Sequence, residues 1–189
     1  MFESRFAIAC SALAIALLAA APVKAADDTE TKAQVCSACH GQNRVPTDPN
    51  TTPIIWGQQG NYLYKELHDY KSGDRANPIM APIAQGLTLP ELRDLANYVA
   101  AKTWPESQAA ANLAATPPEG IVMCKACHGQ NFEGGAPAPR LAGLSYKYLA
   151  VQMQNFADGQ RTNNGDMPGF MRALTDGQRD AIAHYLAGL

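Results

Sequence analysis

Long hydrophobic runs, clustered basic residues and alternating polar and apolar segments are all scarce in this sequence of 189 residues. After the N-terminal region, no apolar stretch approaches the roughly 20 residues that a membrane-spanning helix needs. The 15 lysine and arginine residues are outnumbered by 17 acidic residues and do not gather in one segment, so no nucleic-acid-binding surface is expected. Because no segment alternates as a β-strand would, the sequence predicts an all-α fold.

The N-terminal region has the features of an export signal. Arg5 supplies positive charge, and the apolar run 6–21 is interrupted only by Ser11. Small or modest side chains follow at 23–25, where a signal peptidase would cut. The run is short for a membrane anchor. We therefore predict that residues 1–25 are a cleaved signal peptide and that the mature protein is exported.

The cysteines form a pattern of their own. Of the five, Cys10 leaves with the signal, and the others form two pairs, each followed at once by a histidine. These segments are Cys36-Ser-Ala-Cys39-His40 and Cys124-Lys-Ala-Cys127-His128. No cysteine is left over for a conventional disulfide framework. Cys-x-x-Cys-His is the attachment motif of c-type haem, in which the thiols bind the haem edge and the histidine binds the iron.

Two other uses of paired cysteines agree less well with the sequence. A thioredoxin-like motif would lie beside a strand–helix unit, and none is evident. A zinc site would have to combine two pairs that lie far apart in the chain and in separate repeats. The sequence therefore predicts two covalently bound haem c groups, with one iron each.

An internal repeat covers most of the predicted mature chain. The matching segments are 36–43 with 124–131, 53–57 with 139–143, 62–63 with 148–149, and 72–75 with 158–161. The repeat predicts a tandem duplication, with one domain at 26–103 and a second at 119–189. Between them, residues 104–118 are rich in proline and alanine and are predicted to be a linker.

Both copies are predicted to contain the same helices. Apolar residues at helical spacing follow Asn61 in the first copy and Ser145 in the second, and both of these polar residues are candidate N-caps. The last helix of each copy is expected to open with a capping box. The two boxes are Thr88 with Glu91, and Thr175 with Gln178.

The first haem motif is expected to end a helix that begins near residue 29. The counterpart of this helix should be shorter, because Pro117, Pro118 and Gly120 precede the second motif. Each repeat is so small that a protein core alone would be marginal. We therefore expect the haem-free chain to be poorly folded.

One methionine in each repeat is a candidate for the second axial position of its iron. Met80 and Met167 lie in irregular loops at matching places, each at a similar interval before a Leu-Thr pair. A carrier needs both axial positions filled, and a methionine thioether also raises the potential. Met171 is a rival to Met167, but its repeat counterpart is Ala84.

Other polar residues are candidates for roles at the same sites. His68 and His184 have Gln154 and Asn97 as repeat counterparts, so no ligand role recurs and a helix-surface position is favoured. Arg75 and Arg161 do recur, after matching glycines. They are either partners of haem propionates or solvated loop arginines, and the sequence does not choose between these alternatives.

The whole arrangement resembles the two-haem cytochrome c4 family of bacterial class I cytochromes c. The resemblance rests on the twin Cys-x-x-Cys-His-Gly segments, the Pro-x-x-x-Gly segments at 53 and 139, the methionine loops, and the segment 156–166. The family's usual Leu-Ala-Gly-Gln stands here as 55–58 (Ile-Trp-Gly-Gln) and 141–144 (Leu-Ala-Gly-Leu). The resemblance implies two all-α class I cytochrome c domains with neighbouring haems.

The resemblance also implies a function, which is electron transfer in the periplasm between redox proteins of a respiratory chain, with a terminal oxidase as one candidate acceptor. No nucleic acid, small-molecule substrate or catalytic residue is expected. A close alternative is a dihaem subunit of a dehydrogenase, such as a sulfide-oxidising flavocytochrome. A haem enzyme with one open distal site is a third interpretation, against which the two matched methionines argue.

Overall fold

The structure is a computed structural model, which describes residues 24–105 and 116–189. In these two ranges it contains helices and, apart from one isolated bridge between Gly135 and Ala138, no β-structure. The predicted all-α fold is therefore confirmed. Most of the predicted signal peptide, 1–25, and most of the predicted linker, 104–118, lie outside the described residues. None of the described helices is long and apolar enough to cross a bilayer.

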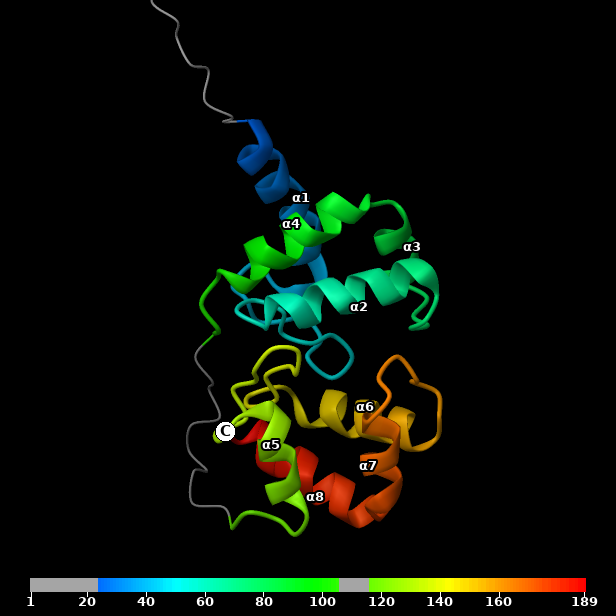
Figure 1. The fold of residues 1–189 in the computed structure, drawn as a ribbon. Coiled ribbons are helices and arrows are strands. Elements are labelled where there is room, and N and C mark those ends of the chain that lie inside the picture. Colours follow the sequence, from blue (N-terminus) through cyan, green and yellow to red (C-terminus); the bar gives the residue numbers. More distant parts are fainter. Residues whose placement is uncertain (1–23, 106–115) are drawn as a thin grey trace, which may run out of the picture.

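The first half consists of α1 (Lys24–His40), α2 (Gly60–Ser72), α3 (Met80–Gln85) and α4 (Leu89–Ala100). Helix α2 packs against both α3 and α4, and α1 packs against α4 (Figure 1). The first haem motif occupies the last turn of α1, as expected, although this helix begins earlier than the predicted residue 29.

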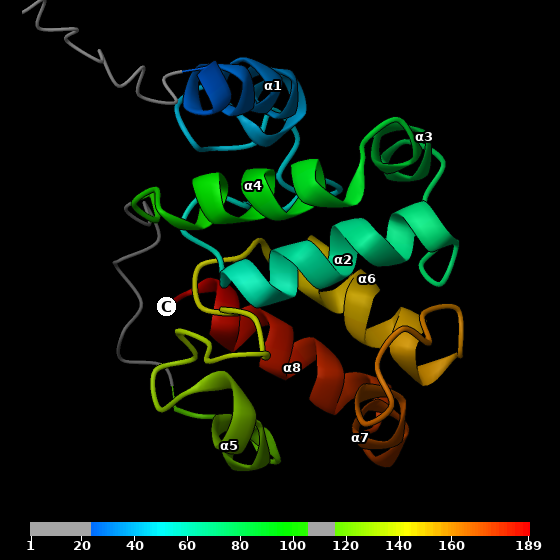
Figure 2. The ribbon, with the colours of Figure 1, turned by 45° about the horizontal axis from the view of Figure 1, so that its top comes forward.

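The second half repeats this order with η1 (Ile121–Cys124), α5 (Lys125–His128), α6 (Tyr146–Ala157), α7 (Met167–Ala173) and α8 (Asp176–Ala187). Helix α6 packs against both α7 and α8. The helix that carries the second haem motif is shortened to the single turns η1 and α5, as the prolines ahead of it predict. Helices α2 and α6 face one another across the boundary between the halves (Figures 1 and 2).

The helix starts agree with the sequence in three of four cases. Both capping boxes form, and Ser145 accepts a hydrogen bond from the Tyr148 amide. The predicted cap at Asn61 is wrong, because α2 already begins at Gly60 and its N-cap residue, Gln59, makes no side-chain capping bond. The chain enters α2 from the tight loop that contains Gly57, and the helix begins two residues earlier than a cap at Asn61 would place it.

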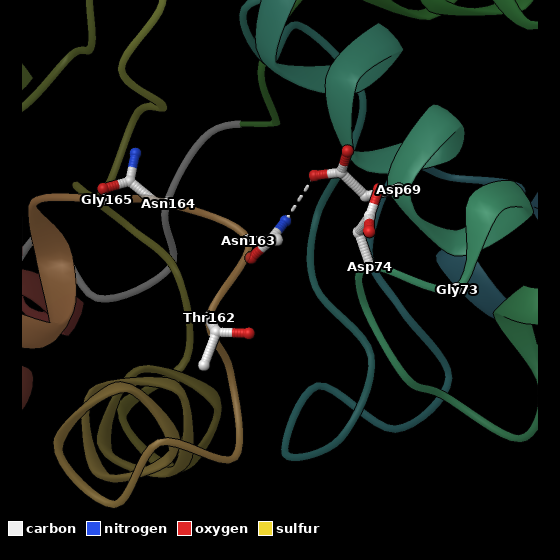
Figure 3. A pocket seen from close by; sticks show the side chains of 7 residues that line it. All are labelled: Asp69, Gly73, Asp74, Thr162, Asn163, Asn164 and Gly165. Carbon is white, nitrogen blue, oxygen red and sulfur yellow. Dashed lines mark hydrogen bonds between the residues drawn. The ribbon is translucent and has the colours of Figure 1, made fainter.

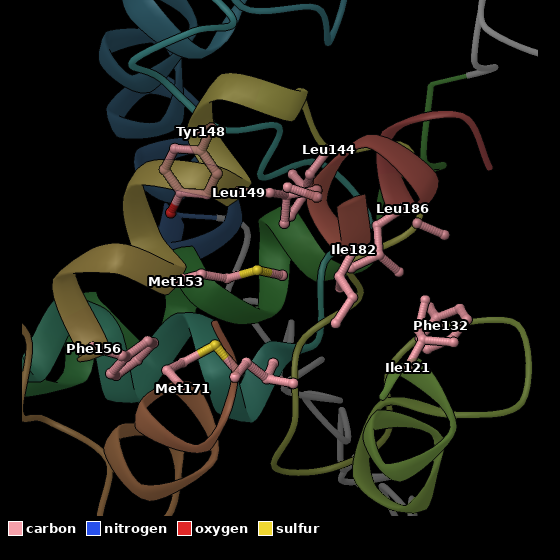
Figure 4. Packing of buried hydrophobic residues seen from close by; sticks show 13 residues of the cluster. Ile121, Phe132, Leu144, Tyr148, Leu149, Met153, Phe156, Met171, Ile182 and Leu186 are labelled. Carbon is pink, nitrogen blue, oxygen red and sulfur yellow. The ribbon is translucent and has the colours of Figure 1, made fainter. Parts of the chain in front are cut away.

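The buried hydrophobic residues differ between the halves. In the second half they form one cluster, which includes Ile121, Phe132, Leu149, Met153, Phe156, Met171, Ile182 and Leu186 (Figure 4). The described cluster of the first half contains Trp56, Leu63, Ala96 and Val99. The buried apolar cluster of the first half is therefore the smaller of the two.

Candidate haem sites

None of the four cysteines of the two motifs forms a disulfide bond. In each motif the first cysteine is half-buried and the second is exposed. Burial raises the pKa of the Cys36 and Cys124 thiols above the ordinary cysteine value. Because one helical turn separates the two members of a pair, both sulfurs can reach one edge of a flat cofactor that lies against the helix end.

Both motif histidines are held by the carbonyl group of a proline. Nδ1 lies 2.8 Å from the Pro53 oxygen in His40, and 2.8 Å from the Pro139 oxygen in His128. A carbonyl oxygen only accepts hydrogen bonds, so Nδ1 carries the proton and the lone pair of Nε2 is left for a metal. Burial lowers the pKa of each imidazole, which favours the neutral form that binds iron.

The two candidate methionines occupy equivalent places. Met80 is the first residue of α3, and Met167 is the first residue of α7. The side-chain oxygen of Asn77 accepts hydrogen bonds from the Met80 amide and the amide before it, at 2.8 and 2.9 Å. The side-chain oxygen of Asn164 does the same for Met167, at 2.9 and 3.0 Å. One local turn therefore presents a methionine in each half.

Met171 is instead part of the core. Its side chain is only 3% exposed and lies among the residues of the second cluster (Figure 4). Its counterpart Ala84 is also fully buried, so both residues serve packing at this position. Among the methionines of the second half, Met167 rather than Met171 has the same surroundings as Met80. This favours the prediction that Met167 is the ligand.

The remaining histidines lie on the surface, in keeping with the favoured interpretation. The His68 side chain is 45% exposed, and that of His184 is 61% exposed and stacks on Tyr146. The two recurrent arginines are not solvated, because Arg75 and Arg161 are each only 8% exposed. The solvated alternative is therefore wrong for both.

The departure from the family sequence at Trp56 has a structural role. Its ring is buried, and Nε1 donates a hydrogen bond of 3.0 Å to the carbonyl oxygen of His40, at the end of α1. Gly57 follows with a positive φ of 77°, and a Cβ there would lie 2.6 Å from the Trp104 backbone nitrogen. The loop after Pro53 is thus bound closely both to the end of α1 and to the chain at Trp104, beyond α4.

The boundary between the halves was not foreseen from the sequence. Gln58, which is only 3% exposed, makes two hydrogen bonds to the backbone of Arg140. Glu66, on α2, receives hydrogen bonds from the guanidinium groups of Arg75 and Arg161, at 2.6 and 2.8 Å. The sequence does contain a signal for this contact between the halves. Gln58 and Glu66 are polar residues on segments that otherwise match between the two repeats.

A polar hollow of about 550 Å³ opens beside this cluster, between the end of α2 and the loop before α7 (Figure 3). Its lining residues come from both halves and are Asp69, Gly73, Asp74, Thr162, Asn163, Asn164 and Gly165. In it, the Asn163 side chain donates a hydrogen bond of 2.7 Å to Asp69. The hollow is therefore bridged rather than open along its whole length.

Known proteins are similar to this chain in both sequence and architecture. Residues 120–189 match the family model for cytochrome c. The chain is 34% identical to cytochrome c4 of Pseudomonas aeruginosa, over 85% of this chain and 86% of that protein. The structure of reduced recombinant cytochrome c4 from Pseudomonas stutzeri superposes with a TM-score of 0.77 and 30% identity, covering 87% of this chain and 98% of that one. The chain belongs to the cytochrome c4 family. It is therefore a dihaem electron-transfer cytochrome with two covalently bound haem c groups.

Two other similar proteins are connected with thiosulfate oxidation. A thiosulfate dehydrogenase electron acceptor of Stutzerimonas stutzeri is 34% identical, over 83% of this chain and 80% of that protein. A thiosulfate dehydrogenase structure from Marichromatium purpuratum has a TM-score of 0.71 and 26% identity, and the match covers 86% of this chain and 40% of that one. Electron acceptance from an enzyme is thus a described role of similar chains.

Proposed function

We propose that the chain is exported to the periplasm and carries single electrons there between redox proteins of a respiratory chain, with a terminal oxidase as one acceptor. The observation that supports this most directly is the matched pair of sites, each with a histidine oriented by a proline carbonyl and a methionine presented by an asparagine turn. The predicted export signal and the family membership support the same proposal.

The proposed ligand sets are symmetrical. The thiols of Cys36 and Cys39 would hold the first haem, with His40 and Met80 as axial ligands. The thiols of Cys124 and Cys127 would hold the second, with His128 and Met167. When bound, each haem supplies a one-electron iron couple. The protein contributes the neutral imidazole, the soft thioether and the surrounding apolar residues, which suit a haem iron of either charge.

Two filled axial positions favour a carrier over an enzyme. Since each histidine is held by a hydrogen bond at Nδ1 and each methionine begins a helix, the ligands need to move little when the iron changes charge. A small rearrangement is what fast electron transfer needs, whereas a catalytic haem needs a position that is open or easily displaced.

A second candidate is a dihaem subunit or direct acceptor of a dehydrogenase. The similarity to thiosulfate dehydrogenase electron acceptors favours this candidate specifically. In that role the chain would still carry electrons, but its donor would be one enzyme, and the two would associate with measurable affinity.

Optical and low-temperature EPR spectra of the holoprotein test the proposed sites. The expected result is two low-spin haems with the weak long-wavelength absorption band of methionine-bound iron(III). Met80→Ala and Met167→Ala should each remove about half of this band, while Met171→Leu should leave it intact. A high-spin haem in the unaltered protein, or loss of the band in Met171→Leu, would contradict the assignment.

Partner assays separate the two candidate roles. The reduced protein should be reoxidised by membranes that contain a terminal oxidase if it is a respiratory carrier. Reduction by thiosulfate in the presence of a purified thiosulfate dehydrogenase, together with co-elution of the two proteins, would support the second candidate. N-terminal sequencing of the protein from a periplasmic fraction tests the predicted cleavage after residue 25.

A further inference from the structure

We propose that Glu66 makes the two haem domains inequivalent, because its buried carboxylate joins arginines of both halves while adding negative charge to the first half alone. This inference rests on the proposed function only in that it needs two haems with separate potentials. It concerns a residue that binds neither haem, so Glu66 is a positioning and tuning residue.

The carboxylate is shared between the halves. Oε2 of Glu66 accepts a hydrogen bond of 2.6 Å from Arg75 of the first half, and Oε1 accepts one of 2.8 Å from Arg161 of the second. The Asn163 amide donates a third hydrogen bond to Glu66, at 2.9 Å. Only 7% of Glu66 is exposed, so little solvent screens the charge.

The repeat relates nearly every member of this cluster to another member. Arg75 matches Arg161, and the residue that matches Glu66 at the same offset is Gln152. The Gln152 side-chain oxygen accepts hydrogen bonds from both arginines, each at 2.9 Å, so it occupies the mirror position. The cluster is therefore close to two-fold symmetric in shape but not in charge. One half has a carboxylate where the other has a neutral amide.

The environment of the cluster makes this difference effective. Two guanidinium groups face the Glu66 carboxylate, whereas the second buried carboxylate nearby, Asp69, contacts Lys65 and Asn163. The phenol of Tyr62 also accepts a hydrogen bond from Arg161, and burial raises its pKa to about 12, so it stays neutral and cannot supply a second anion. Glu66 is thus the carboxylate that directly contacts both arginines.

The position of the charge assigns it to one haem more than to the other. Helix α2, which bears Glu66, packs against α3, which begins at Met80. Helix α6, which bears Gln152, packs against α7, which begins at Met167. A negative charge near a haem favours iron(III) and so lowers the midpoint potential. We therefore expect Glu66 to lower the potential of the first haem more than that of the second, so that a single electron settles in the second half.

Two variants test this inference: one removes the negative charge of Glu66, and the other moves that charge to the second half. Glu66→Gln removes the difference in charge between positions 66 and 152, and the double variant E66Q/Q152E transfers the carboxylate to the second half, where it can still contact both arginines. The measured quantity is the potential of the second haem minus that of the first, from a redox titration with haems assigned by paramagnetic NMR. It should decrease from the unaltered protein to Glu66→Gln, and decrease further in the double variant.

A surface charge provides the matched control. Asp94 lies exposed on α4 of the first half, and Asp94→Asn removes the same charge without touching the cluster. This variant should leave the difference in potential unchanged within error. An equal difference in all four proteins would overturn the inference.

The outcomes also separate this inference from neighbouring ideas. If Glu66 only holds the halves together, Glu66→Gln lowers the thermal stability and the double variant restores it, but the difference in potential does not follow the carboxylate. That result overturns the inference and leaves the proposed function standing. If haem analysis by mass or spectra finds fewer than two low-spin haems in the unaltered protein, it is the proposed function that fails.

Discussion

Gln58 of the first half makes two hydrogen bonds to the backbone of Arg140 in the second half. Its Nε2 donates to the Arg140 carbonyl at 3.0 Å, and its Oε1 accepts from the Arg140 amide at 2.7 Å. Arg140 directly follows Pro139, whose carbonyl orients His128. The side chain of one half therefore holds the loop that positions the proposed iron ligand of the other.

Loss of this link should weaken the contact between the halves. Gln58→Leu introduces the residue type that stands at the matching position 144, and it leaves two backbone groups of Arg140 without partners. Each unpaired group costs about 1–3 kcal/mol, so the free energy of unfolding should fall measurably in denaturant titrations of the holoprotein. Gln59→Leu is the control, because the Gln59 side chain makes a long, exposed hydrogen bond of 3.4 Å to the Glu133 carbonyl and its backbone bonds do not depend on the side chain. Equal losses in both variants would contradict the prediction.

Arg179 should support helix α7 of the second half, which begins with the proposed ligand Met167. It is 7% exposed and donates to the carbonyl of Met171 at 2.6 Å and to that of Leu174, which ties the end of α7 to α8. Its Nε has no hydrogen-bond partner among the described residues. The matching residue in the first half is the buried Leu92. An apolar residue can therefore fill this position, which indicates that the arginine serves the carbonyls.

We expect Arg179→Leu to release the end of the short helix α7 and so to make Met167, at the other end of this helix, easier to displace. Cyanide should then bind the second ferric haem about tenfold more tightly, which corresponds to the loss of about 1.4 kcal/mol. The first haem should be unaffected, and so should both haems in a control variant at the exposed Arg172. Haem-resolved cyanide titration measures this, and an unchanged affinity at the second haem would refute it.

The link between α1 and α4 should be sensitive to acid. A hydrogen bond of 2.7 Å from Lys32, followed by those of the Thr88 cap, lowers the pKa of Glu91 from its ordinary 4.5 to about 2. Since the folded state depresses this pKa, the stabilisation is fully present above pH 4.5 and is lost as the pH falls toward 2. Thermal melts over this window should show a smaller loss in Glu91→Gln than in the unaltered protein. Parallel curves would contradict the prediction.

The two halves should depend on their haems to different degrees. The buried cluster of the first half is smaller, so its structure relies more on the apolar cofactor. A variant with Cys36 and Cys39 replaced by alanine should lose more helical circular dichroism than one with Cys124 and Cys127 replaced. Equal losses, or a greater loss in the second variant, would show that the protein core does not decide the difference.

Local patterns predicted the fold well because they act over a few residues. The capping boxes, the shortened helix before the second motif and the all-α class depend on hydrogen bonds and backbone restrictions that are visible in the sequence. The Asn61 cap failed because the start of α2 is set by the loop at Gly57, which contacts the chain near Trp104. Burial of Arg75 and Arg161 was equally out of reach, since it depends on how two repeats pack against each other.

One contact between the halves has no counterpart in the repeat. The segment between Arg161 and Met167 is one residue longer than the segment between Arg75 and Met80, and within it Asn163 donates hydrogen bonds to Glu66 and Asp69 of the first half. Two copies of the first half would set two glutamates between a pair of arginines, and two copies of the second would set none. The halves have therefore become complementary rather than interchangeable. Each half pairs best with the half to which it is joined in the same chain, and not with a second copy of itself.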